Sequence, residues 1–277
     1  FLRGLSRPCV DNTLLNKISL NEKHIGVRNA MSSLASDSSG FAQRTVYSMK
    51  GSSTGRLTVT GGPNILTMKS TARKSLKSRF KDGQMVQIDL TAAEPTIALN
   101  IAGKDSPDDV YSYIAEEVLN NQVSRDAAKL IVLCALYGQS PKRLQESLPS
   151  TVSARSVINK CRDYFDVNYL EKTLSKQQLL KSLRNAVGRP LFLGLDEKRL
   201  LISYYLQSSA AELSILLFSE FCDKLRNSGF NFVPIYIIHD ALIIDCSPEL
   251  YKALLEKDII SLCIGDWRFN AKATNVS

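Results

Sequence analysis

Two aspartates, each set against apolar residues, are the first candidates for chemistry in this sequence. Asp89 follows the run Met85–Ile88, and Asp240 lies within the stretch YIIHDALIID at residues 236–245. Charged side chains are almost never fully buried unless they are paired, so a carboxylate set into a buried strand at 236–245 requires a counter-charge. If the two strands pair in one sheet, the carboxylates converge and repel one another unless a cation lies between them.

Magnesium is the cation that best suits two converging aspartates. It prefers oxygen ligands and is usually held by one or two carboxylates together with substrate phosphates. Two such ions about 4 Å apart can clamp the attacking and leaving oxygens of a phosphoryl transfer. Taken alone, Asp89 and Asp240 also suit helix caps or ordinary ion pairs, and that plainer interpretation is favoured until other residues support the site.

A cationic helix face provides that support. Residues 124–138 read as a helix that begins at Ser124, has apolar periodicity and ends at Gly138. Four of its residues recur every fourth position and so lie along one face, drifting about 40° per step. They are Arg125, Lys129, Leu133 and Tyr137. Because helix N-termini favour anions, the face predicts a triphosphate-binding end joined to a flat surface on which a base could stack.

Composition bounds the class of protein. The 277 residues are 44% hydrophobic and 22% charged, which suits one large or two modest domains. The net charge of +8 suits a polyanionic partner, although many basic proteins bind nothing acidic. The six cysteines form no C-x-x-C pair and only two histidines are present, which argues against zinc and indicates reduced thiols. No apolar run approaches the ~20 residues of a membrane span, so we expect no membrane partner.

The surrounding pattern predicts a mixture of helices and strands. Residues 69–81 carry a dense run of Lys and Arg, which suits a solvated helix face and a phosphate-contacting face about equally. The other expected elements, in order, are a short strand near 57–59, a strand at 84–88 with a helix-like segment after Asp89, helices at 106–118 and 124–138, helical polar sequence over 140–186, a strand pair at 189–195, a long helix at 200–229, a helix at 247–262 and a strand at 267–273.

Five segments, in order, resemble the family A DNA polymerases, the bacterial DNA polymerase I family. The helix pattern from Arg125 to Gly138 resembles motif B. DLTAAE at 89–94 resembles motif A, and HDA at 239–241 resembles motif C, which is usually His-Asp-Glu. TGRLTVTGGPN at 54–64 is similar to the segment before motif A, and LISYYLQSSAAEL at 201–213 is similar to the segment whose Gln precedes small residues and an acid. Any one of these is a weak signal, but five in order are a strong one.

The resemblance implies an α+β fold shaped as a right hand, with an antiparallel β palm, helical fingers and a short helical thumb. It assigns residues 1–50 to a truncated or minimal thumb and 51–104 to the first part of the palm with motif A. Residues 105–186 become the fingers with motif B, and 187–277 the second part of the palm with motif C.

The resemblance also implies residue roles at the nucleotide. Asp89 and Asp240 would hold two Mg²⁺ ions, for which Mn²⁺ can substitute, and the Leu90 carbonyl would be a further ligand. Arg125 and Lys129 would bind the incoming triphosphate, and Lys129 would also protonate the pyrophosphate leaving group. Asp89, Asp240 and Lys129 are therefore the expected catalytic residues.

Further roles follow for the base, the sugar and the DNA. Tyr137 would stack near the templating position, with Leu133 beside the nucleotide, and Glu94 would exclude ribonucleotides by crowding the sugar 2′ position. The expected DNA contacts come from the minor-groove residues, the primer-end histidine and the basic run, namely Arg56, Gln207, His239, Lys74 and Lys77.

Two departures from the family pattern keep alternatives open. Ala241 stands where motif C usually has Glu, and Asp245 is not expected to replace it, because five residues along a strand from Asp240 it faces the other side. Leu133 stands where an aromatic residue is usual. Both departures suit the single-subunit RNA polymerases, whereas Glu94 and the upstream segment suit DNA synthesis. A catalytically degenerate, nucleic-acid-binding accessory subunit is the third alternative.

The expected partners are a primed DNA template and deoxynucleoside triphosphates. Fifty residues before the palm are short for a full thumb and leave no room for a proofreading exonuclease. A separate exonuclease or processivity subunit, or a further N-terminal region, is therefore an open alternative. The expected location is the cytoplasm of a bacterium or a phage-infected cell, with an organelle as the alternative.

Overall fold

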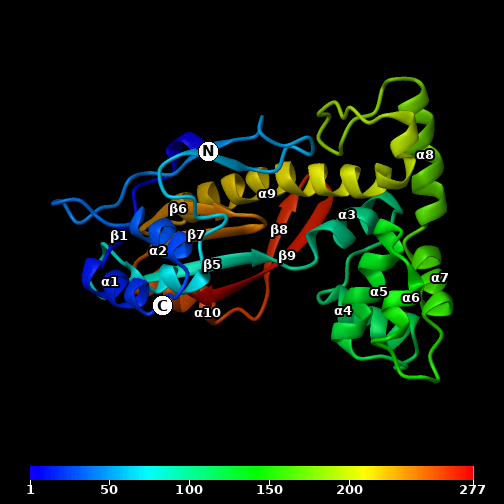
Figure 1. Ribbon diagram of the computed structural model, residues 1–277, viewed down its shortest axis with the longest axis horizontal. Helices are drawn as coiled ribbons and strands as arrows, with labels where there is room; N and C mark the ends of the chain where they lie inside the picture. The colour runs from blue at the N-terminus through cyan, green and yellow to red at the C-terminus, as the bar shows by residue number, and fades with distance from the viewer. Residues whose placement is uncertain (277) are drawn as a thin grey trace. The chain divides into compact units, whose positions relative to one another are not determined.

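A five-stranded sheet organises the computed structural model, which describes residues 1–276 except for the side chains of residues 196 and 198. The strand order is β6-β7-β5-β9-β8, and β5 pairs antiparallel with both β7 and β9 (Figure 1). Together with the helices this confirms the predicted α+β class. The strands are β5 (Gln84–Leu90), β6 (Phe232–Ile238), β7 (Ala241–Cys246), β8 (Ile260–Ile264) and β9 (Trp267–Asn275).

The chain forms two compact units. Unit 1 consists of Phe1–Leu90, Leu213–Asp266 and the residues from Asn270 onward, and unit 2 consists of Thr91–Glu212 with Trp267–Phe269. Most of the sheet therefore belongs to unit 1, and most of the helices belong to unit 2. The four segments expected from the sequence, 1–50, 51–104, 105–186 and 187–277, stay predictions.

The N-terminal segment of unit 1 covers one face of the sheet. Leu15, Met31 and Ile65 are buried in one apolar cluster with Met85 of β5 and Ile243 of β7. This segment therefore shares a core with the sheet. Its elements are η1 (Leu2–Gly4), β1 (Cys9–Val10), α1 (Asn12–Leu20), α2 (Ile25–Ser32), β2 (Val46–Ser48), β3 (Thr58–Gly61), η2 (Ser70–Ser75) and β4 (Leu76–Lys77), and α10 (Pro248–Leu255) also belongs to unit 1.

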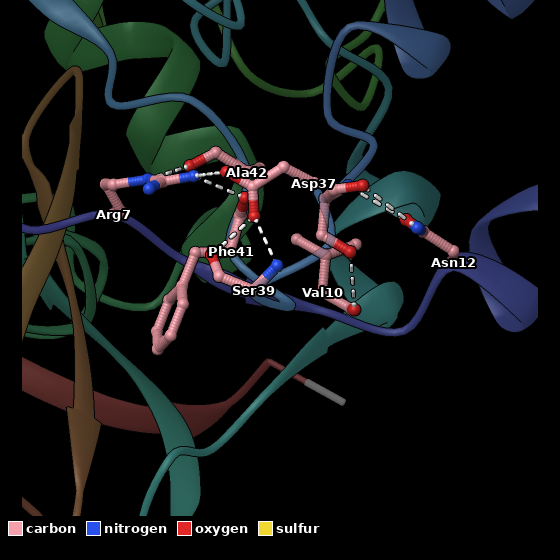
Figure 2. A network of polar contacts seen from close by, with 8 residues as sticks. Arg7, Val10, Asn12, Asp37, Ser39, Phe41 and Ala42 are labelled. Carbon is pink, nitrogen blue, oxygen red and sulfur yellow. Dashed lines mark hydrogen bonds and ion pairs between the residues drawn. The ribbon is translucent and has the colours of Figure 1, made fainter.

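Polar contacts between distant parts of this segment fix its loops. Figure 2 shows Arg7, whose Nε donates to the Ala42 carbonyl at 2.9 Å and which also pairs with Asp37. Asn12 at the start of α1 donates from Nδ2 to the Ser36 carbonyl at 3.1 Å. These bonds satisfy backbone groups that the short strands leave unpaired.

Unit 2 is helical. The helix predicted at 124–138 is present as α5, with Ser124 as its N-cap and Gly138 in the left-handed conformation after it. The helices are α3 (Ala93–Ile101), α4 (Val110–Tyr113), the π-helix η3 (Ile114–Val118), α5 (Arg125–Tyr137), α6 (Pro141–Gln145), α7 (Ala154–Tyr164), α8 (Val167–Leu179) and η4 (Leu195–Leu200), and α9 (Leu201–Asn227) begins in this unit and ends in unit 1.

Several predicted elements differ from the structure. The helix expected at 106–118 begins after Asp109, because the Asp109 carboxylate accepts from the backbone N–H groups of residues 111 and 112. The strand pair expected at 189–195 is reduced to an isolated bridge at Pro190. The helix expected at 247–262 ends at Leu255, and the apolar residues after it form β8. The basic run at 69–81 forms a 3-10 helix and a short strand instead of one helix face.

Helix α9 matches the long helix expected at 200–229. Its length and composition alone would allow it to cross a membrane, contrary to the expectation that no segment would. Half of its most apolar window is buried inside the protein, however, and Leu213, Leu217 and Phe218 are almost fully buried. We therefore interpret α9 as a core helix.

Candidate active site

The stretch 236–245 is a hairpin, and the prediction of a single buried strand is wrong. Strands β6 and β7 pair through Ile238 and Ala241, which leaves His239 and Asp240 as a two-residue turn. Both turn residues are exposed, and His239 has a φ of 56°. Tight hairpin turns require positive φ, which histidine adopts more readily than most residues. Asp240 is therefore at the tip of a turn, and it needs no buried counter-charge.

The hairpin brings Asp240 next to Asp89. Strand β5 pairs with β7 so that Asp89 lies opposite Ala241, and the Leu90 N–H donates to the Asp240 carbonyl at 3.0 Å. The condition set by the sequence, that the two strands pair in one sheet, is therefore met. Asp89 is half-buried at the end of β5, whereas Asp240 is exposed.

A polar chain leads from a cation to Asp89. Arg73 Nη1 donates to Gln87 Oε1 at 3.2 Å, and Gln87 Nε2 donates to Asp89 Oδ2 at 3.3 Å. Burial lowers the pKa of the Arg73 guanidinium, and the negative charge of Asp89 partly offsets this effect. Arg73 was part of the basic run in the sequence, but its contact with the Asp89 side of β5 depends on tertiary packing.

The oxygen donors of Asp89 and Asp240 fit magnesium, and the place where these two residues lie side by side is called the corner below. Asp89 near the end of β5 and Asp240 in the turn between β6 and β7 lie on adjacent backbone segments, and the carboxylates of both are hard oxygen donors. Among the side chains that the structure describes, no group of three or more His, Cys, Asp or Glu gathers as a metal cluster. A site with two protein carboxylates suits an ion that keeps its remaining positions for water and substrate phosphates.

Asp245 does not supply a third carboxylate. It lies opposite Met85, at the far end of β7, and its side chain is only 1% exposed. Arg79 Nε donates to it at 2.8 Å. The expected reason was wrong: Asp245 shares the face of Ala241, since alternate strand residues point the same way. Its distance along β7 and its ion pair exclude it from the corner.

In unit 2, helix α5 presents the expected face. The buried side of the helix consists of Ala128, Ile131, Val132, Cys134, Ala135 and Leu136. Arg125 and Lys129 are exposed, and Leu133 and Tyr137 are half-buried. Arg125, Lys129 and Tyr137 are therefore not part of the buried apolar side of α5, as their spacing predicts.

Asp109 and Tyr111 complete the cationic end of α5, and the sequence interpretation missed both. Arg125 Nε donates to Asp109 Oδ2 at 2.7 Å, which raises the pKa of Arg125. Burial would raise the pKa of Asp109, but hydrogen bonds from Arg125 and from backbone N–H groups outweigh it, so this pKa is lowered. The Tyr111 ring lies 5.6 Å from Arg125 Cζ and 5.9 Å from Lys129 Nζ. The Asp109 carboxylate therefore orders Arg125, and the Tyr111 ring lies beside both cations.

The remaining predicted site residues are spread over both units. In unit 1, Arg56 precedes β3, Lys74 lies in η2, Lys77 lies in β4, and all three are exposed, as is His239. In unit 2, Glu94 is half-buried in the first turn of α3, and Gln207 is half-buried on α9. Their individual roles stay predictions.

The comparisons with known proteins support the same family. The model of DNA polymerase family A matches residues 19–262. The chain belongs to DNA polymerase family A. A comparison of this family A chain with curated protein sequences finds no match.

One similar solved structure is described as the POL domain of Pol1 from M. smegmatis in complex with DNA primer-template and dNTP. It is 18% identical in sequence, with a TM-score of 0.62, and the match covers 83% of the present chain. The likeness shows that the two share a fold. The family A chain spans 47% of the length of that structure's chain.

Proposed function

We propose that this family A chain is a template-directed DNA polymerase, which adds deoxynucleotides to the 3′ end of a primer. The observation that carries the proposal is that Asp89, near the end of β5, lies next to Asp240 in the turn between β6 and β7. Family membership and the primer-template and dNTP bound to the similar M. smegmatis domain support DNA and nucleotides as partners.

In the proposed reaction the primer 3′-hydroxyl attacks the α-phosphate in line, and pyrophosphate leaves. Asp89, Asp240 and the Leu90 carbonyl would hold the divalent ions. Bound Mg²⁺, or Mn²⁺ in its place, would supply positive charge for the attacking and leaving oxygens. Arg125 and Lys129 bind the triphosphate, and Lys129 donates a proton to the departing pyrophosphate. The exposure of both cations on α5 supports this assignment.

The other residues select the nucleotide and position the DNA. Tyr137 stacks near the templating base, Leu133 lies beside the nucleotide, and Glu94 crowds the sugar 2′ position. The DNA contacts come from Arg56, Gln207, His239, Lys74 and Lys77, of which all but Gln207 are exposed. Phosphate contacts of this kind give affinity without reading the base sequence.

One observation favours a second candidate function. Ala241 places a methyl group opposite Asp89, so a palm without catalysis, acting as a nucleic-acid-binding accessory subunit, is the rival. A single-subunit RNA polymerase activity is less favoured, because the resemblance assigns Glu94 to the position that would exclude the ribose hydroxyl. The proposed setting is the cytoplasm of a bacterium or phage-infected cell, with an organelle as the alternative. A separate exonuclease or processivity subunit remains part of the proposal.

Primer extension tests the proposal. With Mg²⁺, a primed template and deoxynucleotides, the wild-type chain is expected to extend the primer. Asp89→Ala and Asp240→Ala are expected to abolish extension while DNA affinity, measured by fluorescence anisotropy, is retained. Asp258→Ala, which removes an exposed carboxylate elsewhere in unit 1, is the matched control.

The outcomes separate the candidate functions. A wild-type chain that binds primed DNA but does not extend it would support the accessory subunit. Equal use of ribonucleotides and deoxynucleotides would support the RNA polymerase alternative.

A further inference from the structure

Asp89 has a lysine beside it on the sheet. Strand β9 pairs with β5 so that Lys272 lies directly opposite Asp89, on the side away from Ala241. Directly paired residues of antiparallel strands point to the same face, with Cβ atoms roughly 4.5–5.5 Å apart. Three neighbouring side chains on one face of the sheet, across β7, β5 and β9, are therefore the methyl group of Ala241, the carboxylate of Asp89 and the exposed side chain of Lys272.

Asp89 has a second cationic side chain near it, that of Arg73 in η2. Arg73 is linked to it through Gln87, by the hydrogen bonds of 3.2 Å and 3.3 Å described above. The carboxylates of Asp89 and Asp240 are therefore accompanied by two cationic side chains, and the formal charges of these four groups cancel. A corner with no net charge attracts a free divalent cation less than two unaccompanied carboxylates would.

We propose that Lys272 is a positioning residue that weakens the binding of divalent cations by the free protein and makes this binding depend on the triphosphate of the incoming nucleotide. The inference rests on the proposed function, in which Asp89 and Asp240 hold the ions. A 2+ and a 1+ charge about 6 Å apart in water repel by an energy that corresponds to roughly tenfold in affinity. The negative triphosphate offsets this repulsion when it binds with the metal.

Direct Mn²⁺ binding tests the proposal without relying on activity. Electron paramagnetic resonance titrations of the full chain measure Mn²⁺ affinity at low ionic strength, with and without primed DNA and a non-hydrolysable deoxynucleotide analogue. Lys272→Met is expected to bind Mn²⁺ roughly tenfold more tightly than wild type without the analogue, and the difference is expected to shrink when it is present. Lys272→Arg is expected to restore weak binding, because it restores the charge.

Lys257→Met is the matched control. Lys257 is exposed and follows α10 in the same unit, and Lys257→Met removes the same charge as Lys272→Met. Because Lys257 is not paired with Asp89 in the sheet, its substitution is expected to leave Mn²⁺ affinity unchanged. Because Lys272 is itself exposed, its variants are expected to fold, and circular dichroism checks this. Added potassium chloride is expected to reduce the effect of Lys272→Met, since salt screens exposed charges.

Two results would overturn the proposal. One is unchanged Mn²⁺ affinity in folded Lys272→Met, including the case in which neither protein binds Mn²⁺. The other is a raised KM for deoxynucleotides with no change in Mn²⁺ affinity, which would make Lys272 a nucleotide contact. A third result would contradict the proposed function but not the role of Lys272. In that case the protein would never extend a primer, although Asp89→Asn would still abolish Mn²⁺ binding and Lys272→Met would still tighten it.

Discussion

Substitution of Asp245 separates structural from catalytic carboxylates in this chain. Asp245 lies on the same strand as Ala241 but is tied into the core of unit 1. It accepts hydrogen bonds from Arg79 Nε at 2.8 Å, the Arg79 backbone N–H at 3.1 Å and Ser78 Oγ at 2.5 Å. We therefore predict that Asp245→Ala reduces stability without removing the chemistry.

The expected loss follows from the burial of the two partners. The Asp245 side chain is 1% exposed, and Arg79 is 23% exposed. Removal of one partner from a buried ion pair costs about 3–5 kcal/mol. Because water can partly rehydrate Arg79, we expect the lower end, about 3 kcal/mol of unfolding free energy. Asp258→Ala is the control for an exposed carboxylate, with an expected change within about 0.5 kcal/mol.

Urea unfolding followed by circular dichroism measures the stability, and primer extension at a temperature where every variant is folded measures the activity. Asp245→Ala is expected to keep extension within about threefold of wild type, whereas Asp240→Asn is expected to lose at least about a hundredfold at unchanged stability. A folded Asp245→Ala protein without activity would refute the reasoning. So would a stability change below about 1 kcal/mol.

Three further predictions concern substrate binding. Glu94→Ala is expected to weaken discrimination against ribonucleotides by at least about tenfold in kcat/KM, and unchanged discrimination would remove Glu94 from the sugar site. Asp109→Asn is expected to raise the KM for deoxynucleotides about threefold to tenfold, because Arg125 loses the partner that orders it. The lowered pKa of Asp109 keeps this pair charged at neutral pH, so wild type is expected to approach the variant only as the pH falls below the ordinary value of about 4. DNA affinity is expected to fall steeply with salt, and Lys74→Ala to reduce the slope of log K against log salt by about 1, with an unchanged slope arguing against a phosphate contact.

Local signals explain the parts of the structure that the sequence predicted well. The bounds of α5 follow from a serine cap, apolar periodicity and a glycine that ends the helix with a φ of 65°. Strand β5 follows from an apolar run that ends at Asp89. In both cases neighbouring residues determine the conformation, and the packing against the rest of the chain agrees with it.

The sequence predictions were wrong where tertiary contacts determine the local conformation. The turn at His239 and Asp240 has no glycine or asparagine, and the buried apolar residues on both sides of it are typical of one strand with a carboxylate set into it. The apolar residues of β8 follow α10 so closely that their periodicity could not be separated from that of a helix. The register that places Lys272 opposite Asp89 joins residues far apart in the chain, so no local pattern reveals it.

The two residues that flank Asp89 in the sheet change the electrostatics in the same direction. Ala241 lacks the third carboxylate, and Lys272 adds a cation on the other side of Asp89. Both reduce the attraction of the free site for a divalent ion. A palm that had become a passive scaffold would have no need to keep Asp89 and Asp240 adjacent, or to hold Arg125 and Lys129 against Tyr111. The adjacency of Asp89 and Asp240 and the two cations beside Tyr111 therefore support the proposed polymerase over a palm that only binds DNA, and the proposed effect of Lys272 would make its metal binding depend on the nucleotide.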